Sequence, residues 1–218
     1  RDVAPSRGLG DVYKRQPLEE ITEREQLTSS GQSNINTALR NVNALLRLTT
    51  NLINFERADT YSGSLYVSEY ELSTYMEETI DAFRSYANIK HINLTYESSF
   101  RYLNVWLDKD KIDSILKNII SNALKYTPDG GNVHVFTSET EDTWSIEVKD
   151  TGIGIPASEQ KKLFKMHFRG SNAINSKVTG SGIGLLLVGK LVHLHKGKLN
   201  FSSMEGKGSC IKITFPKG

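Results

Sequence analysis

Cysteine is almost missing from this sequence, and long apolar runs are missing altogether. Cys210 is the single cysteine among 218 residues, so no disulfide can close within the chain, and a reducing compartment is favoured. No apolar run approaches the roughly 20 residues that a membrane helix needs, and no signal-peptide stretch opens the chain. We therefore expect a globular protein in a reducing compartment.

An excess of charge of one sign is missing as well. The 27 Lys and Arg residues against 25 Asp and Glu give a net charge of +2, so nothing in the charge balance favours a nucleic-acid partner. Hydrophobic residues make up 38% and charged residues 24%, which excludes disordered, collagen-like and low-complexity chains. The length allows one or two domains with a real core.

Residues 6–16 resemble the in-frame translation of a DNA-sequencing adaptor, whose last codons would encode Asp11–Gln16. A segment of that origin is excluded from fold reasoning. We therefore expect residues 1–16 to be a non-native tail, and the natural sequence to have been cut just before Pro17. A flexible natural tail is the alternative interpretation.

Apolar residues recur at alternating steps of four and three in the next part of the chain. The seam consists of Ile35, Leu39, Val42, Leu46, Thr49 and Ile53, widened by Leu45, Leu48, Leu52 and Phe55. A break at Thr28–Gly31 predicts two helices, Pro17–Gln26 and Ser33–Ala58, as a hairpin that would dimerise as a four-helix bundle. A plain coiled-coil spacer is the alternative.

A turn at 61–64 marks the expected domain boundary, and the pattern beyond it alternates between strand and helix periods. The expected strands are 65–70, 92–96, 103–107, 133–138, 143–149, 198–203 and 209–215, and the expected helices are 71–86, 108–126 and 183–195. Asp108 is a suitable N-cap for the middle helix. No βαβ regularity is present, so we predict an α+β fold. The domain after the turn would be a two-layer α/β sandwich, a mixed, antiparallel-rich sheet with helices on one face.

Asn118 and Asn122 lie four residues apart and share one face of the predicted helix. Amide side chains on the inner side of a helix need polar partners. A hydrated Mg²⁺ with phosphate oxygens would supply them, because Mg²⁺ takes hard oxygen ligands and keeps waters. Lys125, one turn on, could meet phosphate charge. Taken alone, the pair would be better interpreted as solvated side chains near a helix end.

Two glycine-bearing segments follow. Asp150–Gly154 comes directly after a predicted strand, where a carboxylate can accept a hydrogen bond from an exocyclic amine such as that of adenine, and glycine lets a flat ring approach closely. Gly180–Gly184 opens an apolar helix, whose first N–H groups form an anion site. Each segment alone is weak evidence, and the second lacks the context of a dinucleotide fingerprint.

Together with Phe164 and Phe168, these segments resemble the ATP-binding domain of sensor histidine kinases, in the wider family that includes gyrase-type ATPases. The N, G1, F and G2 boxes fall, in the family's order, on residues 118–127, 150–154, 164–168 and 180–184. The resemblance runs from about residue 65 to 216, and no motif residue is lost from the four boxes.

The resemblance implies that ATP is held in a pocket under a mobile lid at about 156–179. Asp150 would bind the adenine amine, and Asn122 with Asn118 would hold Mg²⁺. Lys125 and Tyr126 would lie near the phosphates and the ribose. The residues implied as nucleotide-binding are Asn122, Tyr126, Asp150, Gly152, Gly154, Arg169, Lys177, Gly180, Gly182 and Gly184, with Asn118, Asn122 and Lys125 as catalytic. Ser209, in a turn before the last strand, could act beside Asp150.

Kinases of this type phosphorylate a histidine in an H-E-x-x-x-P sequence on the first helix of a dimeric hairpin. The resemblance implies that residues 17–60 are the remainder of that hairpin and 61–218 the catalytic domain, that the chain forms a homodimer, and that a response-regulator receiver domain takes the phosphoryl group. The five histidines lie outside such a motif, and we expect them to be structural: His91, His134, His167, His193 and His195. The acceptor would precede Pro17, in a membrane-anchored parent whose cytoplasmic part this is.

Other interpretations stay open. An ATP-gated regulatory module or pseudokinase would bind ATP without phosphotransfer. ATPases of the gyrase, chaperone or mismatch-repair type need a carboxylate four residues before the magnesium asparagine, where this chain has Asn118. An anti-sigma-type serine kinase would lack the upstream hairpin.

Overall fold

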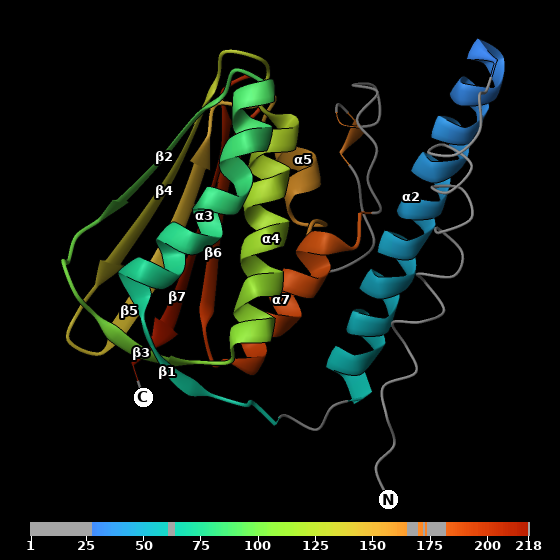
Figure 1. Cartoon of the computed structure of the whole chain (residues 1–218). Coiled ribbons are helices and arrows are strands. Elements are labelled where there is room, and N and C mark those ends of the chain that lie inside the picture. The colour runs from blue at the N-terminus through green and yellow to red at the C-terminus, as the bar shows by residue number, and fades with distance from the viewer. Residues whose placement is uncertain (1–27, 61–63, 165–169, 172, 174–181, 218) are drawn as a thin grey trace, which may run out of the picture. The chain divides into compact units, whose positions relative to one another are not determined.

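The computed structural model describes residues 28–60, 64–164, 170–171, 173 and 182–217 (Figure 1). The chain forms two compact units, Arg1–Glu56 and Arg57–Gly218. No described helix is long and apolar enough to cross a membrane. The first predicted helix of the hairpin, Pro17–Gln26, lies outside the described residues.

Helix α2 spans Ser29–Thr60, so it begins one turn before the predicted Ser33. Thr28 explains the difference. Its Oγ1 accepts a hydrogen bond from the Gly31 N–H at 3.1 Å, and its carbonyl accepts from the Gln32 N–H at 2.9 Å. This is the pattern of a helix N-cap, which favours threonine. The expected break is therefore the start of α2.

The second unit is built on a five-stranded mixed sheet, which confirms the predicted α+β class (Figure 1). In spatial order its strands are β2 (Asn93–Ser98), β4 (Asn132–Glu139), β5 (Thr143–Asp150), β7 (Gly208–Pro216) and β6 (Lys198–Met204). Strands β2 and β4 are parallel, and the other neighbours are antiparallel. Strands β5 and β7 are antiparallel neighbours, so the end of β5 lies beside the start of β7. This end of the strand pair carries part of the candidate site.

The described part of this unit contains the helices α3 (Leu72–Ile89), α4 (Lys109–Tyr126), the short α5 (Ala157–Gln160) and α7 (Gly184–Leu194). Helices α3, α4 and α7 lie on one face of the sheet (Figure 1). Trp144, Ile146 and Val148 alternate along β5 and are buried beneath them. Because side chains alternate across a strand, Asp150 continues this row on the helix-facing side.

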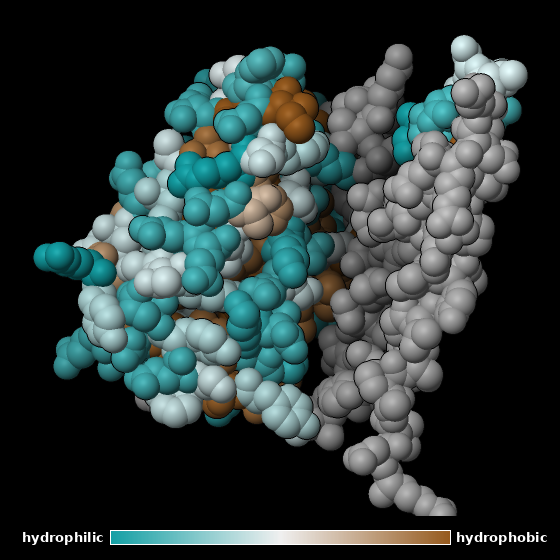
Figure 2. Space-filling model, viewed as in Figure 1, coloured by the Kyte–Doolittle hydropathy of each residue, from teal (hydrophilic) through white to brown (hydrophobic). Residues whose placement is uncertain are grey.

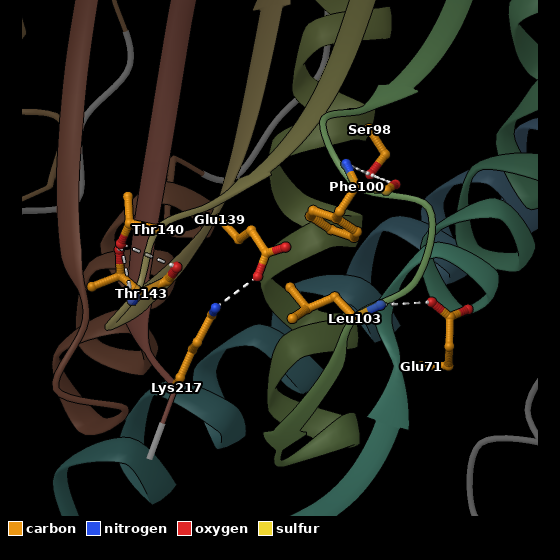
Figure 3. Close-up of polar contacts among 8 residues, drawn as sticks. All are labelled: Glu71, Ser98, Phe100, Leu103, Glu139, Thr140, Thr143 and Lys217. Carbon is orange, nitrogen blue, oxygen red and sulfur yellow. Dashed lines mark hydrogen bonds and ion pairs between the residues drawn. The ribbon is translucent and has the colours of Figure 1, made fainter.

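The expected strand at 65–70 does not join the main sheet. Strand β1 (Ser68–Glu71) instead pairs antiparallel with β3 (Asn104–Leu107) as a separate ribbon. The carboxylate of Glu71 holds this ribbon in place. Its Oε1 and Oε2 accept hydrogen bonds from the first N–H groups of α3. Its Oε1 also accepts a hydrogen bond from the Leu103 N–H at 3.4 Å (Figure 3). Burial raises the pKa of Glu71, but these hydrogen bonds outweigh it and hold the pKa below its ordinary value.

Asp108 is the N-cap of α4, as predicted. It is 3% exposed, and its carboxylate accepts from the Lys111 N–H at 3.3 Å and from the Tyr66 N–H at 2.9 Å. Lys111 Nζ forms an ion pair with it at 2.5 Å. Burial raises the pKa of Asp108, but these donors together lower it below the ordinary value. The cap therefore fixes the helix that carries both asparagines.

The surface of this unit is largely hydrophilic in the view of Figure 2, with scattered apolar side chains. At the opposite end of the sheet from the site, Lys217 pairs with Glu139 at 2.6 Å and joins the end of β7 to the β4–β5 hairpin (Figure 3).

Candidate functional site

Asp150 ends β5 and turns its carboxylate toward the helix layer. Its Oδ1 accepts hydrogen bonds from the Gly152 N–H at 2.8 Å and from the Ser209 N–H at 3.2 Å. In the described part of the chain, Oδ2 makes no hydrogen bond. Burial raises the pKa of this carboxyl, and the two backbone donors offset the rise in part. One oxygen is thus held in place, and the other is left for a ligand.

The loop after β5 rests directly on the carboxyl end of α4. The Ile153 N–H donates to the carbonyl of Tyr126 at 3.1 Å. A Cβ on Gly152 would lie 2.7 Å from that carbonyl oxygen, so only glycine fits between the loop and the helix. Gly154 has φ +62°, and its Cβ would lie 2.0 Å from the Met204 carbonyl oxygen. Both glycines therefore serve a close backbone approach, as a turn of this kind requires.

The last carbonyls of α4 are satisfied by a residue that sequence analysis did not select. Lys90 Nζ donates to the carbonyls of Leu124 and Thr127 at 2.8 Å each, and to that of Lys125 at 3.3 Å. A cation at a helix C-terminus also complements the helix dipole. The contact joins residues 34 to 37 positions apart, so no local sequence signal could have revealed it.

Asn118 and Asn122 lie on one side of α4, as predicted. Asn118 Nδ2 donates to the Ser114 carbonyl at 2.8 Å, which leaves Oδ1 turned toward Gly184, where an added Cβ would lie 2.4 Å from it. The half-buried side chain of Asn122 has no hydrogen-bond partner among the residues the structure describes. Two amide oxygens that receive no hydrogen bond from the described residues fit part of a Mg²⁺ shell that keeps water and phosphate ligands.

The described residues contain no cluster of three or more His, Cys, Asp or Glu side chains that could hold a metal ion by themselves. A cation at Asn118 and Asn122 would therefore depend on oxygens brought by a ligand. This is the usual situation for Mg²⁺, which is bound by few protein groups together with substrate phosphates.

Helix α7 starts beside Asn118. Gly182 has φ +73°, and the N-cap Ile183 makes no side-chain hydrogen bond to the first turn. Within the described residues no side chain caps the first N–H groups of α7, and the positive end of the helix dipole lies there. An anion at the start of α7 would accept hydrogen bonds from these N–H groups and complement the helix dipole, and a cation bound to it would face the Asn118 amide oxygen.

The two glycine-bearing segments thus meet α4 at two points. Gly184 contacts Asn118, and Gly152 contacts Tyr126, eight residues further along the helix. At 1.5 Å per residue the points are about 12 Å apart. Between them lies Lys125, whose Nζ sits 4.8 Å from the centre of the Tyr126 ring. An elongated ligand with a flat end and an anionic end fits this arrangement.

Part of the predicted set lies outside the described residues: Phe168, Arg169, Lys177 and Gly180. Phe164 is described and packs edge-on against Phe201 of β6, with ring centres 5.5 Å apart. Phe164, within the predicted lid segment 156–179, therefore packs against the sheet.

Residues 107–218 match the family of histidine kinase-, DNA gyrase B- and HSP90-like ATPases. The chain belongs to this family. The match begins at the end of β3 and covers α4, both glycine-bearing segments and the last two strands. Among its relatives is the sensor histidine kinase WalK of Bacillus subtilis (strain 168), 35% identical over 79% of this chain and 28% of WalK. The circadian input-output histidine kinase CikA of Thermosynechococcus vestitus is 30% identical over 96% of this chain and 28% of CikA.

These relatives and the family match show an ATP-binding catalytic domain of the sensor histidine kinase type. The chain spans less than a third of the length of WalK and of CikA. The fold agrees with the full-length kinase ShkA in complex with AMPPNP, with a TM-score of 0.77 and 20% identity over 97% of this chain and 46% of that one. It also agrees with the nucleotide-free catalytic domain of the histidine kinase ThkA, with a TM-score of 0.62 and 23% identity over 70% of this chain and 97% of that one.

Proposed function

We propose that this chain is the catalytic portion of a two-component sensor histidine kinase, which transfers the γ-phosphoryl group of ATP to a histidine on a dimerisation helix for relay to a response-regulator aspartate. The observation that carries the proposal is the meeting of two glycine-bearing segments with one face of α4, at Asn118 and at Tyr126.

At the base end, the free oxygen of Asp150 accepts a hydrogen bond from the adenine amine. Tyr126 lies at the carboxyl end of α4, where the Gly152 loop allows close approach of the ring and the ribose. Gly154 keeps the loop in its turn through its positive φ.

At the phosphate end, the start of α7 supplies backbone N–H groups, with Gly182 and Gly184 leaving room for the triphosphate. Asn118 and Asn122 hold Mg²⁺ through their amide oxygens. Mg²⁺ supplies charge neutralisation at the phosphates when it is bound. Lys125 adds a cation near the phosphates, and Arg169, Lys177 and Gly180 of the lid segment complete the set.

The transfer is a displacement at the γ-phosphorus. A histidine ring nitrogen attacks, a phosphorus–nitrogen bond forms, and the bond to the bridging oxygen breaks with its electron pair leaving on ADP. The chain's residues contribute mainly by positioning the nucleotide and stabilising charge, as phosphoryl transfer generally requires.

The rest of the proposal concerns the whole protein. Residues 17–60 form the remainder of a dimerisation hairpin, 61–218 form the catalytic domain, and 1–16 are a non-native tail. The chain is a homodimer, the phosphoryl group goes to a histidine on the first helix of that hairpin, and a receiver domain is its partner. The parent protein is membrane-anchored, with this part in the cytoplasm.

A chimera tests the transfer. Residues 1–16 are replaced by an acceptor helix of a related kinase that carries the H-E-x-x-x-P sequence, and the protein is incubated with γ-labelled ATP and Mg²⁺. We expect acid-labile, base-stable protein label that disappears when the acceptor histidine is changed to glutamine. Nucleotide binding without label in the folded dimeric chimera would contradict the kinase proposal and favour an ATP-gated regulatory module.

A further inference from the structure

Ser203, near the end of β6, has three polar neighbours around one hydroxyl group. Its Oγ lies 2.9 Å from the Ile155 N–H, 2.9 Å from the Gly208 carbonyl oxygen and 2.9 Å from Ser209 Oγ. These contacts join the segment after the Asp150 loop to the β6–β7 turn.

The three contacts determine which way each hydrogen points. The Ile155 N–H can only donate, and the Gly208 carbonyl can only accept. A hydroxyl has one hydrogen, so Ser203 must give its hydrogen to Gly208. Ser209 must then donate its own hydrogen to Ser203 Oγ, because two oxygens without a hydrogen between them would repel at 2.9 Å.

Ser209 therefore has only lone pairs left for a ligand. Its backbone N–H is bonded to Asp150 Oδ1, and it shares the helix-facing side of β7 with the buried residues Ile211 and Ile213. The Ser209 hydroxyl and the Asp150 carboxylate are thus neighbouring groups on the same side of the sheet, and both can only accept.

We infer that Ser203 is a positioning residue that fixes the hydrogen-bond direction of Ser209, and thereby makes the base site select a purine with an amino group at position 6 over one with an oxo group there. The inference rests on the proposed function, in which Asp150 receives that amine. An amine has two hydrogens, which match two acceptors. A 6-oxo group would face two acceptors and gain no donor.

Loss of the Ser203 hydroxyl would release this constraint. In Ser203→Ala the Ser209 hydroxyl can rotate and donate, so it can serve a 6-oxo group as well as an amine. If Ser203 had only a structural role, Ser203→Ala would loosen the β6–β7 turn, and the affinities for both kinds of base would fall together. The ratio of the two affinities separates these cases.

The experiment is calorimetric titration of the chain with ADP and with inosine diphosphate, which carries the 6-oxo group. The variants are Ser203→Ala, Ser203→Thr, which keeps the hydroxyl, and Ser209→Ala, which removes it. Ser202→Ala is the matched control, because Ser202 is the exposed neighbour on the other face of the same strand.

We expect the wild-type chain, Ser203→Thr and Ser202→Ala to prefer ADP by the same large factor. In Ser203→Ala this preference should fall about tenfold, the effect of one hydrogen bond, and Ser209→Ala should show a fall of similar size if Ser203→Ala does not fold. An unchanged ratio in folded Ser203→Ala or Ser209→Ala would overturn the inference. A wild-type chain that binds neither nucleotide would instead overturn the proposed function beneath it.

Discussion

The burial of Asp150 carries a cost in stability that its proposed role in binding adenine would explain. Its carboxyl has a pKa above the ordinary value because it is buried, so the folded state holds the proton more tightly than the unfolded chain does. The stability that this group adds is present at low pH and is lost as the pH rises through the folded pKa. At neutral pH the charged Asp150 is therefore a destabilising group that a binding site would retain.

Asp150→Asn tests this at the residue scale. Removal of the buried charge should leave the free energy of unfolding at pH 7 equal to or above that of the wild type, and this difference should shrink toward pH 4. ADP affinity should fall about 10- to 100-fold, since hydrogen bonds to charged groups contribute about 1.5–3 kcal/mol. Urea unfolding at both pH values and calorimetry measure the two effects.

Glu147→Gln is the control for Asp150→Asn, because Glu147 lies on the other face of β5. It should leave ADP affinity unchanged. A large loss of stability at pH 7 in Asp150→Asn would show that the carboxylate is mainly structural.

Two glycines of α7 provide a second comparison at this scale. A Cβ at Gly184 would lie 2.4 Å from Asn118 Oδ1, whereas one at Gly189 would meet Phe164 at an ordinary 3.6–3.7 Å. Gly184→Ala should displace Asn118 and lower ADP affinity at least tenfold. Gly189→Ala should keep that affinity and stabilise the helix by up to about 1 kcal/mol. Calorimetry and thermal unfolding measure both, and equal effects from both substitutions would refute the contact.

At the scale of elements, α4 depends on groups at both ends. Asp108 caps its start, and Lys90 caps three carbonyls at its end. The sequence predicted the first, because an aspartate before an apolar periodic segment is a local signal. It could not predict the second, because a long-range cap leaves no local pattern.

Lys90→Met should destabilise the unit by about 1–3 kcal/mol, because buried carbonyls lose their donor. ADP affinity should also fall, since the Gly152 loop rests on the same helix end. Lys117→Met, at an exposed position of α4, should stay within about 0.5 kcal/mol of the wild type. Urea denaturation measures both, and equal stabilities for the two variants would contradict the capping role.

In other elements too, local sequence predicted the boundaries, whereas contacts between distant residues could not be predicted. The boundaries of β5 and α4 followed from alternation and from capping. The separation of the β1–β3 ribbon from the main sheet did not, because the two strands resemble the other strands in sequence and their pairing joins residues more than 30 positions apart. The start of α2 was missed because Thr28 was interpreted as a break and not as a cap.

At the scale of the whole molecule, the order of the four boxes predicted the family, which no single box indicates. The structure brings Gly184 to Asn118 and Gly152 to Tyr126, two pairs on α4 whose segments were each ambiguous in the sequence. The sequence did not indicate which atoms touch, since the Gly184–Asn118 contact depends on how α7 packs against α4.

The proposed homodimer gives a prediction at this scale. Leu46→Asp places a charge in the seam of the helical segment and should convert a dimer into a monomer in sedimentation experiments. Asn41→Asp, at an exposed position off the seam, should leave the dimer intact. A Leu46→Asp variant that stays dimeric would show that the seam does not form the interface.

The proposed mechanism depends on a nucleotide that lies along α4 with its base at Tyr126 and its phosphates at Asn118. Calorimetric titration of adenosine and of ADP with Mg²⁺ into the wild type, Asp150→Asn and Gly184→Ala tests this placement. We expect Asp150→Asn to weaken both ligands by a similar factor, whereas Gly184→Ala should weaken ADP and spare adenosine. Equal weakening of adenosine by Gly184→Ala, or intact adenosine binding in Asp150→Asn, would contradict the placement.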